Sequence, residues 1–442
     1  MKLEGKSLKH DFFRFIIPSL IAQWVYALYT MADGMFVARG VSELALSGVN
    51  IAMPFITFLF SVALMFAVGS STTIAILIGQ KKEYDAHTIY TQNLVSILII
   101  SVLLTVIVLC NSHSISLFLG ATDLTIEYVE TYIRTIAMFS TFFIVSYSFE
   151  VIIKTDGFPM KATILVTFGA VLNCILDYVF VIILHKGVGG AAFATGVSQL
   201  CVSVLYFTHF LSKNTSMKFI HFRFQPKVFF RTMQIGFSSA ITEMSPGIVI
   251  FLFNQYILRF LNEEAIVSYT IVSYVNTIIV MSMLGIAQGI QPLVSYHYGK
   301  GSLRKCNLLL RYALLFGACY SIIAFFLTRS FASPLVNLFV SENMTVLRAS
   351  SVSIFLTFSF SFLLCGWNVI IGGFLTSIER PKSSMAISLG RGFLLVALSL
   401  EVLTRLFGGD GIWWVASLSE GLCLILTLGL FFLYKAKIVK SY

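Results

Sequence analysis

The sequence has few charged residues for its length. Only 11% of the 442 residues are Asp, Glu, Lys or Arg, whereas 57% are hydrophobic and the mean hydropathy is +0.90. A soluble globular chain carries roughly 25% charged residues. This scarcity of charge excludes a water-soluble enzyme, a disordered protein and a nucleic-acid-binding module.

The chain also lacks the short motifs of several other classes. Its seven cysteines are odd in number, form no C-x-x-C pair and lie mostly within hydrophobic runs, so they predict neither a disulfide framework nor a zinc site. No phosphate-binding loop of the form GxxxxGKS or GxxxxGKT occurs, which argues against a pump driven by ATP. No alternating ten-residue pattern recurs, as a membrane β-barrel would require.

Long hydrophobic runs are what the sequence has in abundance. A spanning helix needs about 20 mostly apolar residues, and twelve runs meet that need, at about 12–38, 46–79, 89–110, 126–153, 161–184, 189–211, 229–260, 265–298, 308–328, 345–375, 383–407 and 412–434. The first run is about twice as long as the ~7–15 apolar residues of a signal peptide and has no small-residue cleavage site, so we expect it to stay as a helix. The predicted fold class is an all-α integral membrane protein with twelve transmembrane helices.

The basic residues are distributed unevenly between the two sides of the predicted membrane. Most of the 30 Lys and Arg residues fall at the amino terminus, after the even-numbered helices or at the carboxyl terminus, among them Lys2, Lys6, Lys81, Lys218, Lys300, Lys382 and Lys440. Cytoplasmic loops carry such an excess, so we expect both termini in the cytoplasm and a location in the cell membrane. The net charge of +10 is thereby explained as a topology signal rather than as a nucleic-acid footprint.

The two halves of the chain resemble each other. Matching residues recur at a separation close to half the chain length: Ala45 and Ala265, Gly69 and Gly289, Gly79 and Gly299, Pro159 and Pro381, Gly187 and Gly409, Gly189 and Gly411, Ala194 and Ala416. Six spans in each half predict two six-helix bundles related by a pseudo-two-fold axis along the membrane normal. We expect an amino-terminal lobe over 1–211, a cytoplasmic linker over 212–228 and a carboxyl-terminal lobe over 229–442. In transporters built from such repeats, the substrate path lies between the halves.

Four polar residues in the first half fall at one predicted depth. Asp33, Asp177 and Thr195 each lie about 8–11 Å below the outer surface, at 1.5 Å per helical residue, and Asn173 lies one turn before Asp177 on the same helix face. Ionisable groups inside a bilayer are costly and mark functional sites by default. The equivalent residues of the second half do not repeat this set; they are Phe253, Leu395, Ser399 and Glu420.

Other charged residues in the predicted spans have competing interpretations. Glu243 lies beside Pro246 and Gly247, and it is either a cation-binding group or a buried carboxylate bonded to Ser239 or Thr242. Three pairs are spaced i,i+4 and are interpreted as structural: Glu130 and Arg134, Glu150 and Lys154, Glu401 and Arg405. We expect the Glu150 pair to sit at the membrane interface. Arg391 has no local partner, and Glu420 could pair with it only through the tertiary fold.

These motifs resemble those of the MATE (multidrug and toxic compound extrusion) family. The run from Pro18 through Ala32-Asp33-Gly34-Met35-Phe36-Val37 is similar to that family's first helix, and Asn173-Cys-Ile-Leu-Asp177-Tyr-Val-Phe is similar to its helix 5. The entries to helices 6 and 12, Gly189-Gly-Ala-Ala-Phe-Ala-Thr195 and Gly411-Ile-Trp413, also match. The pairing of Asp33 with Asp177 resembles the prokaryotic DinF-like and MepA-like branches more than the NorM branch.

The resemblance implies a secondary exporter of drug-like, often cationic compounds, driven by inward H⁺ or Na⁺. It assigns Asp33, Asn173, Asp177 and Thr195 to a cation-coupling site, with no catalytic residue, no cofactor and no metal other than Na⁺. NorM-type acids of helices 7 and 10 are absent from their usual places, which argues against a second cation site in the carboxyl-terminal half.

We expect the central cleft to be lined by aromatic and Met side chains. The candidate substrate-binding residues are Trp24, Tyr26, Tyr29 and Glu243. Pro18 is expected to be a bend point of the first helix, because it leaves the Arg14 carbonyl without its helical donor. The expected partners are small lipophilic cations and bilayer lipid, the protein acting as a monomer.

Two alternatives to an exporter remain open. A lipid-linked oligosaccharide flippase of the same wider superfamily would need several cationic residues in the cleft for pyrophosphate, and only Arg134 and Arg391 are available. An intramembrane enzyme would need a nucleophile or metal set at one depth. The pairing of Asp33 with Asp177 resembles an aspartyl dyad, but it lacks the YD and GxGD settings of intramembrane proteases.

Overall fold

The computed structural model describes residues 7–213, 215–337 and 344–439, and all regular structure in these ranges is helical. The long helices of the first half are α1 (Leu8–Gly40), α2 (Glu43–Gly79), α3 (Glu83–Phe118), α4 (Ile126–Thr155), α5 (Pro159–Asp177) and α6 (Gly187–Leu211). Those of the second half are α7 (Pro226–Phe260), α8 (Glu263–Gly299), α9 (Leu303–Ser330), α11 (Thr345–Phe358), α12 (Phe362–Ser377), α13 (Pro381–Leu389), α14 (Leu395–Phe407) and α15 (Val415–Val439). A short helix, α10 (Ala332–Asn337), was not predicted.

The twelve predicted spans are all helical, which confirms the fold class. Among the described residues, eleven helical segments are long and apolar enough to cross a membrane. The last of them, Pro381–Ala436, has 56 residues and contains two predicted spans, separated by a 3₁₀ turn over Gly408–Trp414. A crossing needs only about 20 residues, so this segment supplies the eleventh and twelfth spans.

Short irregular turns interrupt three of the spans. Residues Tyr178–Ile183 form a π-helical turn directly after α5, and Gly390–Leu394 form another between α13 and α14. A 3₁₀ turn at Ser359–Ser361 separates α11 from α12. Turns of the π type occur often at functional sites. The first of these two turns directly follows Asp177, and the second contains Arg391.

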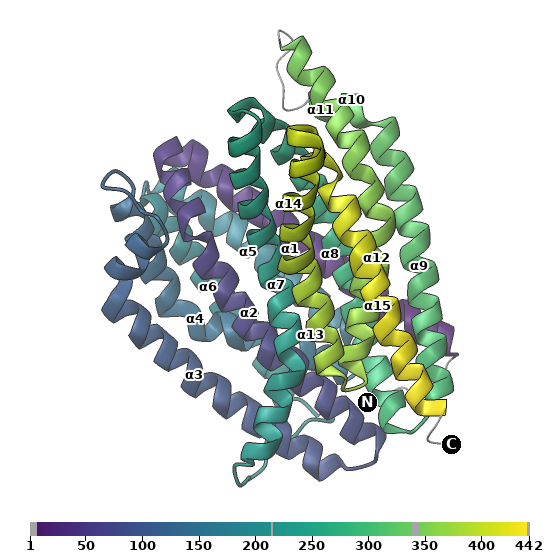
Figure 1. Cartoon of the computed structure of the whole chain (residues 1–442). Coiled ribbons are helices and arrows are strands. Elements are labelled where there is room, and N and C mark those ends of the chain that lie inside the picture. The colour runs from purple at the N-terminus through teal and green to yellow at the C-terminus, as the bar shows by residue number, and fades with distance from the viewer. Residues whose placement is uncertain (1–6, 214, 338–343, 440–442) are drawn as a thin grey trace.

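The helices form two bundles that stand side by side (Figure 1). One hydrophobic core is built mainly from α2 to α6, and the other mainly from α8 to α15. The first and seventh helices cross between the bundles. Phe12, Phe15 and Ile16 of α1 belong to the second core, whereas Phe229 and Met233 of α7 pack against the first.

Both described chain ends lie at one end of the molecule, here called the terminal end (Figure 1). There the two bundles touch backbone to backbone along α2 and α7. A Cβ atom at Gly69 would overlap the Thr232 carbonyl of α7, and one at Gly236 would overlap the Met65 carbonyl of α2. Only glycine permits so close an approach, so these two residues seal the bundles together.

The same contact is repeated where α1 meets α8. A Cβ atom at Gly289 would lie 2.9 Å from the Cα atom of Ile16, and one at Gly285 would lie 3.1 Å from that of Leu20. Gly69 and Gly289 were matched by the internal repeat in the sequence. The structure shows that the repeat preserves two equivalent closures, here called the glycine seam (Gly69, Gly236, Gly285 and Gly289).

The segment between the bundles is attached to the first of them. The Gln225 amide donates to Gln92 of α3 at 2.9 Å, and the Ile220 amide donates to Thr91 at 3.2 Å. Ser216 donates to Asp156, which also accepts from His209 Nε2 at 3.0 Å. Burial alone would raise the pKa of the Asp156 carboxyl, but these hydrogen bonds outweigh it and hold the pKa below its usual value.

Of the basic residues used above to predict the orientation in the membrane, Lys2, Lys6 and Lys440 lie outside the described residues.

Candidate functional site

A cavity of about 300 Å³ lies between the bundles, on the side of the glycine seam away from the terminal end. Its wall is aromatic and apolar for the most part, and includes Tyr29, Phe60, Tyr132, Phe143, Phe253, Tyr269, Phe358, Met53 and Met281. Among the described residues that line it, four are charged types: Asp33, Glu243, Arg391 and Glu420. The cavity therefore combines a lipophilic wall with three acids and one base.

The four polar residues predicted for the first half do meet beside this cavity. Asp33 of α1 and Thr195 of α6 line it, while Asp177 and Asn173 of α5 lie behind them at 0% and 1% exposure. The Asn173 Nδ2 group donates to the Thr195 hydroxyl at 3.2 Å, and that hydroxyl donates to the Ala191 carbonyl at 3.1 Å. Asp33 and Asp177 are neighbours across the contact between α1 and α5.

This cluster contains acceptors that have no donors. Asp33 Oδ1, both Asp177 carboxylate oxygens and Asn173 Oδ1 are buried, and no hydrogen bond to them is found among the described residues. A buried acceptor without a partner costs about 1–3 kcal/mol, and more when it is charged. A small cation, or a proton shared between carboxylates, would supply the partner that these four buried oxygens lack.

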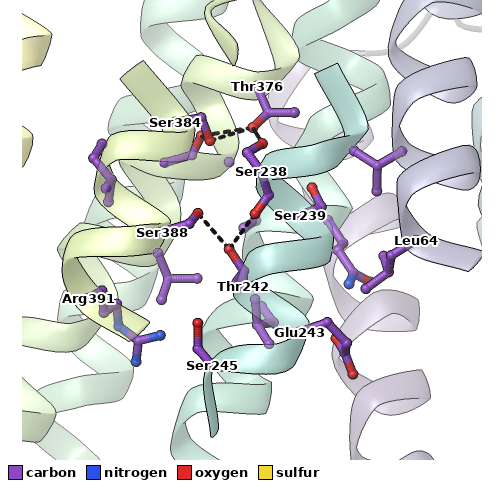
Figure 2. A pocket seen from close by; sticks show the side chains of 18 of the residues that line it. Leu64, Ser238, Ser239, Thr242, Glu243, Ser245, Thr376, Ser384, Ser388 and Arg391 are labelled. Atoms are coloured by element: carbon purple, nitrogen blue, oxygen red, sulfur yellow. Dashed lines mark hydrogen bonds between the residues drawn. The ribbon is translucent and has the colours of Figure 1, made fainter. Parts of the chain in front are cut away.

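Glu243 lies on α7, one turn before Pro246, which lies inside that helix. It lines the large cavity and also a smaller one of about 70 Å³ nearer the terminal end. Neither Ser239 nor Thr242 is hydrogen bonded to it in the part of the chain that the structure describes; the Thr242 hydroxyl instead donates to the Ser238 carbonyl at 2.9 Å. Figure 2 shows the Glu243 side chain directed away from that hydroxyl.

Hydroxyl groups line the smaller cavity where α7 faces α12 and α13 (Figure 2). Thr376 lies 3.1 Å from Ser238 and 2.7 Å from Ser384, and Thr242 lies 2.7 Å from Ser388, all oxygen to oxygen. A water molecule needs about 10–15 Å³ of such volume, so the cavity has room for several. This polar lining was not predicted, because isolated Ser and Thr residues in a helix are unremarkable in sequence.

A second charged cluster contains the pairing of Arg391 with Glu420 that the sequence left open, together with Asn368, which was not predicted. The Arg391 Nε atom donates to Glu420 Oε1 at 2.7 Å, and Asn368 Nδ2 donates to Glu420 Oε2 at 2.7 Å and to the Glu420 carbonyl at 2.9 Å. These residues come from the π-helical turn, α15 and α12, and the fold alone brings them together. Arg391 thus has the tertiary partner that it lacks locally.

The three aromatic candidates of α1 differ in whether they line the large cavity, although the Tyr26 and Tyr29 rings lie 5.7 Å apart. Tyr29 lines the large cavity. Tyr26 does not; its hydroxyl donates to Glu150 at 2.8 Å inside the first bundle. Trp24 does not line it either, because its indole donates at 2.9 Å to Ser282 of α8 and ties the two bundles together. The expectation that all three line the cleft is therefore corrected to Tyr29 alone.

Glu150 and Lys154 do not form the exposed pair expected at the membrane interface. Lys154 Nζ lies 2.6 Å from Glu150 Oε1, but the two side chains are only 4% and 3% exposed, so the pair is buried within the first bundle. The helical spacing that suggested a surface pair cannot report which face of α4 is covered. The pair formed by Glu130 and Arg134, 3.4 Å apart and partly exposed, lies at the surface of the bundle.

Pro18 lies within α1, which continues on both sides of it. Its carbonyl accepts a hydrogen bond from Thr163 of α5 at 2.8 Å. The helix that carries Asp33 is therefore tied, at its proline, to the helix that carries Asp177.

Comparisons with known proteins identify relatives over nearly the whole chain. The family model MatE matches residues 18–179 and 249–399. The multidrug export protein MepA of Staphylococcus haemolyticus is 22% identical over 432 residues, which are 96% of this chain and 93% of that protein. A MATE transporter solved in complex with MaL6 superposes with a TM-score of 0.92 at 21% identity, over 99% of this chain and 98% of the other.

The outward-facing structure of a multidrug resistance MATE family transporter is similarly close. It has a TM-score of 0.91 at 21% identity and covers 98% of this chain and 97% of its own.

Proposed function

Because this chain belongs to the MATE family of transporters, we propose that it exports lipophilic, often cationic compounds across the cell membrane by antiport with H⁺ or Na⁺. Family membership makes the chain a transporter rather than an enzyme, and it needs no cofactor. The relative from S. haemolyticus is named for multidrug export and matches over almost the full length of both chains. An apolar, aromatic cavity with acidic groups is suited to bind flat lipophilic cations.

The observation that carries ion coupling is the set of unpartnered oxygens at Asp33, Asp177 and Asn173. In this proposal, the coupling ion neutralises the two carboxylates. A proton would bridge them, whereas Na⁺ would also recruit the neutral oxygens of Asn173 and Thr195, since hard cations prefer oxygen ligands. The Thr195 hydroxyl already donates to a backbone carbonyl, so a lone pair on its oxygen is what it offers to Na⁺.

Movement of α1 would couple the ion to the substrate. This helix carries Asp33 and Tyr29 on the cavity, packs against α5 and α8, and contains Pro18, which weakens its hydrogen-bond ladder. While the carboxylates are charged, α1 cannot pack closely against apolar neighbours. Neutralising them removes this obstacle. The ion and the substrate would then favour different arrangements of one two-state element, which is what exchange requires.

Three further features belong to the proposal. We assign the lobes to residues 1–211 and 229–442, with the linker 212–228 on the cytoplasmic side together with both termini. The attachment of the linker to α3 and to Asp156 supports its movement with the first lobe. The glycine seam would then be the closed cytoplasmic gate. We take the working unit to be a monomer.

The flippase alternative is not favoured. Arg391 is the one basic residue among the described residues of the large cavity, and Arg134 lies at the surface beside Glu130 instead. Three acids and one base would repel a lipid pyrophosphate.

Transport by purified protein in proteoliposomes tests the proposal. An H⁺ gradient and a Na⁺ gradient are imposed separately, and uptake or release of a fluorescent cation is followed. Asp33→Asn and Asp177→Asn should each abolish gradient-driven transport without reducing the folded yield. If Na⁺ is the ion, Thr195→Ala should weaken the Na⁺-driven rate more than the H⁺-driven rate. Wild-type rates in both Asp variants would refute the coupling site.

A further inference from the structure

The guanidinium group of Arg391 occupies an unusual position for a membrane protein. It is carried by the π-helical turn Gly390–Leu394, and its side chain is only 14% exposed. It lines both the large cavity and the smaller, hydroxyl-lined one. In Figure 2 it points from its helix into the space in front of Ser245 of α7.

Arg391 is held in place through one of its five N–H donors. Its Nε atom donates to Glu420 at 2.7 Å. The second oxygen of that carboxylate is occupied by Asn368, whose amide also bonds the Glu420 carbonyl and so fixes the side chain on its own helix. Glu420 is thus a positioning residue, because it orients the guanidinium plane without covering its far edge.

The far edge of the guanidinium has no protein partner. No hydrogen bond from Nη1 or Nη2 of Arg391 is present among the described residues, and Ser245, its neighbour in Figure 2, donates instead to the Ile241 carbonyl at 2.8 Å. Four charged N–H groups that face a largely apolar cavity are costly unless something accepts from them. Two parallel N–H groups at a fixed orientation match the two oxygens of a carboxylate.

We propose that the terminal edge of Arg391 is a carboxylate-binding subsite of the transport cavity, which makes this residue a determinant of specificity for substrates that carry a carboxylate. This inference rests on the proposed export function and names a binding residue of the same cavity. The carboxylate binds end-on to Nη1 and Nη2, while an amine on the same substrate faces the acids Glu243 and Asp33 across the cavity.

The charge of the cavity selects the kind of anion. Three acids and one base line it among the described residues, so a dianionic phosphate would meet net repulsion, whereas a single carboxylate balanced by its own amine would not. The competing explanation is that Arg391 serves only to neutralise buried Glu420. These explanations differ in one respect: only a subsite discriminates between a carboxylate and its ester.

Two dyes provide that discrimination. Rhodamine 110 carries a free carboxylate and rhodamine 123 is its methyl ester, so the pair share one ring system and differ in this group. Equilibrium binding of each dye to purified full-length protein is measured by fluorescence polarisation. The readout is the ratio of the two dissociation constants. Arg391→Gln should shift this ratio against rhodamine 110 by about 10- to 100-fold, because charge-assisted hydrogen bonds to the carboxylate are lost.

Two further variants keep the test decisive. Arg391→Gln leaves Glu420 without its counter-charge and could fail to fold, so the double variant Arg391→Gln/Glu420→Gln replaces the ion pair by two amides and should show the same shift. Arg405→Gln removes an arginine of the same bundle that lies at the surface beside Glu401, and should leave the ratio as in the wild type. A ratio unchanged by both Arg391 variants would overturn the subsite.

The outcomes also separate this inference from the proposed function. If the wild-type protein binds and exports rhodamine 123 but does not bind rhodamine 110, the subsite is wrong and the export function stands. If it binds neither dye, both are contradicted.

Discussion

Replacing Lys154 by Met would leave a buried carboxylate without its counter-charge. Lys154 and Glu150 are 4% and 3% exposed, so water does not screen their interaction at 2.6 Å. Breaking a buried ion pair by removing one partner typically costs about 3–5 kcal/mol. Glu150 keeps its hydrogen bond from Tyr26 at 2.8 Å, which places the expected loss at the lower end, about 3 kcal/mol, or a roughly 150-fold change in the unfolding constant.

The double variant Glu150→Gln/Lys154→Met should recover most of this loss. Replacing both partners removes the desolvated charges, and such replacements are often neutral or stabilising. Tyr26 can still donate to the amide oxygen of the glutamine. The expected free energy of unfolding is therefore within about 1 kcal/mol of wild type.

Unfolding by SDS from detergent micelles, followed by tryptophan fluorescence, measures both variants. Arg134→Met is the matched control, because it breaks an i,i+4 pair of the same kind at the surface and should change stability by no more than about 1 kcal/mol. The reasoning fails if Lys154→Met is no worse than this control, or if the double variant is as unstable as the single one.

Three shorter predictions concern substrate binding, export and topology. Glu243→Gln should weaken binding of rhodamine 123 by about 10-fold through loss of a counter-charge, with little effect on a neutral compound; equal affinities in binding titrations would refute that role. Gly236→Val should reduce export more than 10-fold, because a side chain there strikes the α2 backbone, whereas Gly429→Val, where nothing lies within 4 Å, should export normally. Phe224→Cys in a cysteine-free background should react with an impermeant maleimide only after cells are opened; labelling of intact cells would reverse the topology.

The cation cluster could be anticipated from sequence, whereas the second cluster could not. Asp33, Asn173, Asp177 and Thr195 share one predicted level in the first half, and the resemblance to the MATE family implies that they form one site. Arg391 and Glu420 are joined only through the packing of a π-helical turn against α15, and helical depth carries no information on rotation about the axis.

Rotation also explains the errors. The spacing of Glu150 and Lys154 shows that they meet, but not that their side of α4 is covered by the rest of the bundle. Trp24 and Tyr26 are two residues apart, so a helix turns them to different faces, whereas Tyr29 lies one turn after Tyr26 with the ring centroids 5.7 Å apart. One bonds to the second bundle, one is buried in the first, and Tyr29 faces the cavity.

The sequence by itself determined the environment, the number of helices and the two-fold repeat of this protein. Those properties follow from where apolar residues run for about 20 positions and where glycine and proline recur, because a bilayer imposes length and internal hydrogen bonding on every span. Only the tertiary structure decided which faces of those helices meet: the closed glycine seam, the burial of Glu150 with Lys154, and the free edge of Arg391 in the cavity. Each depends on helix rotation and close packing between segments distant in sequence, and a one-dimensional pattern of hydrophobicity does not encode either.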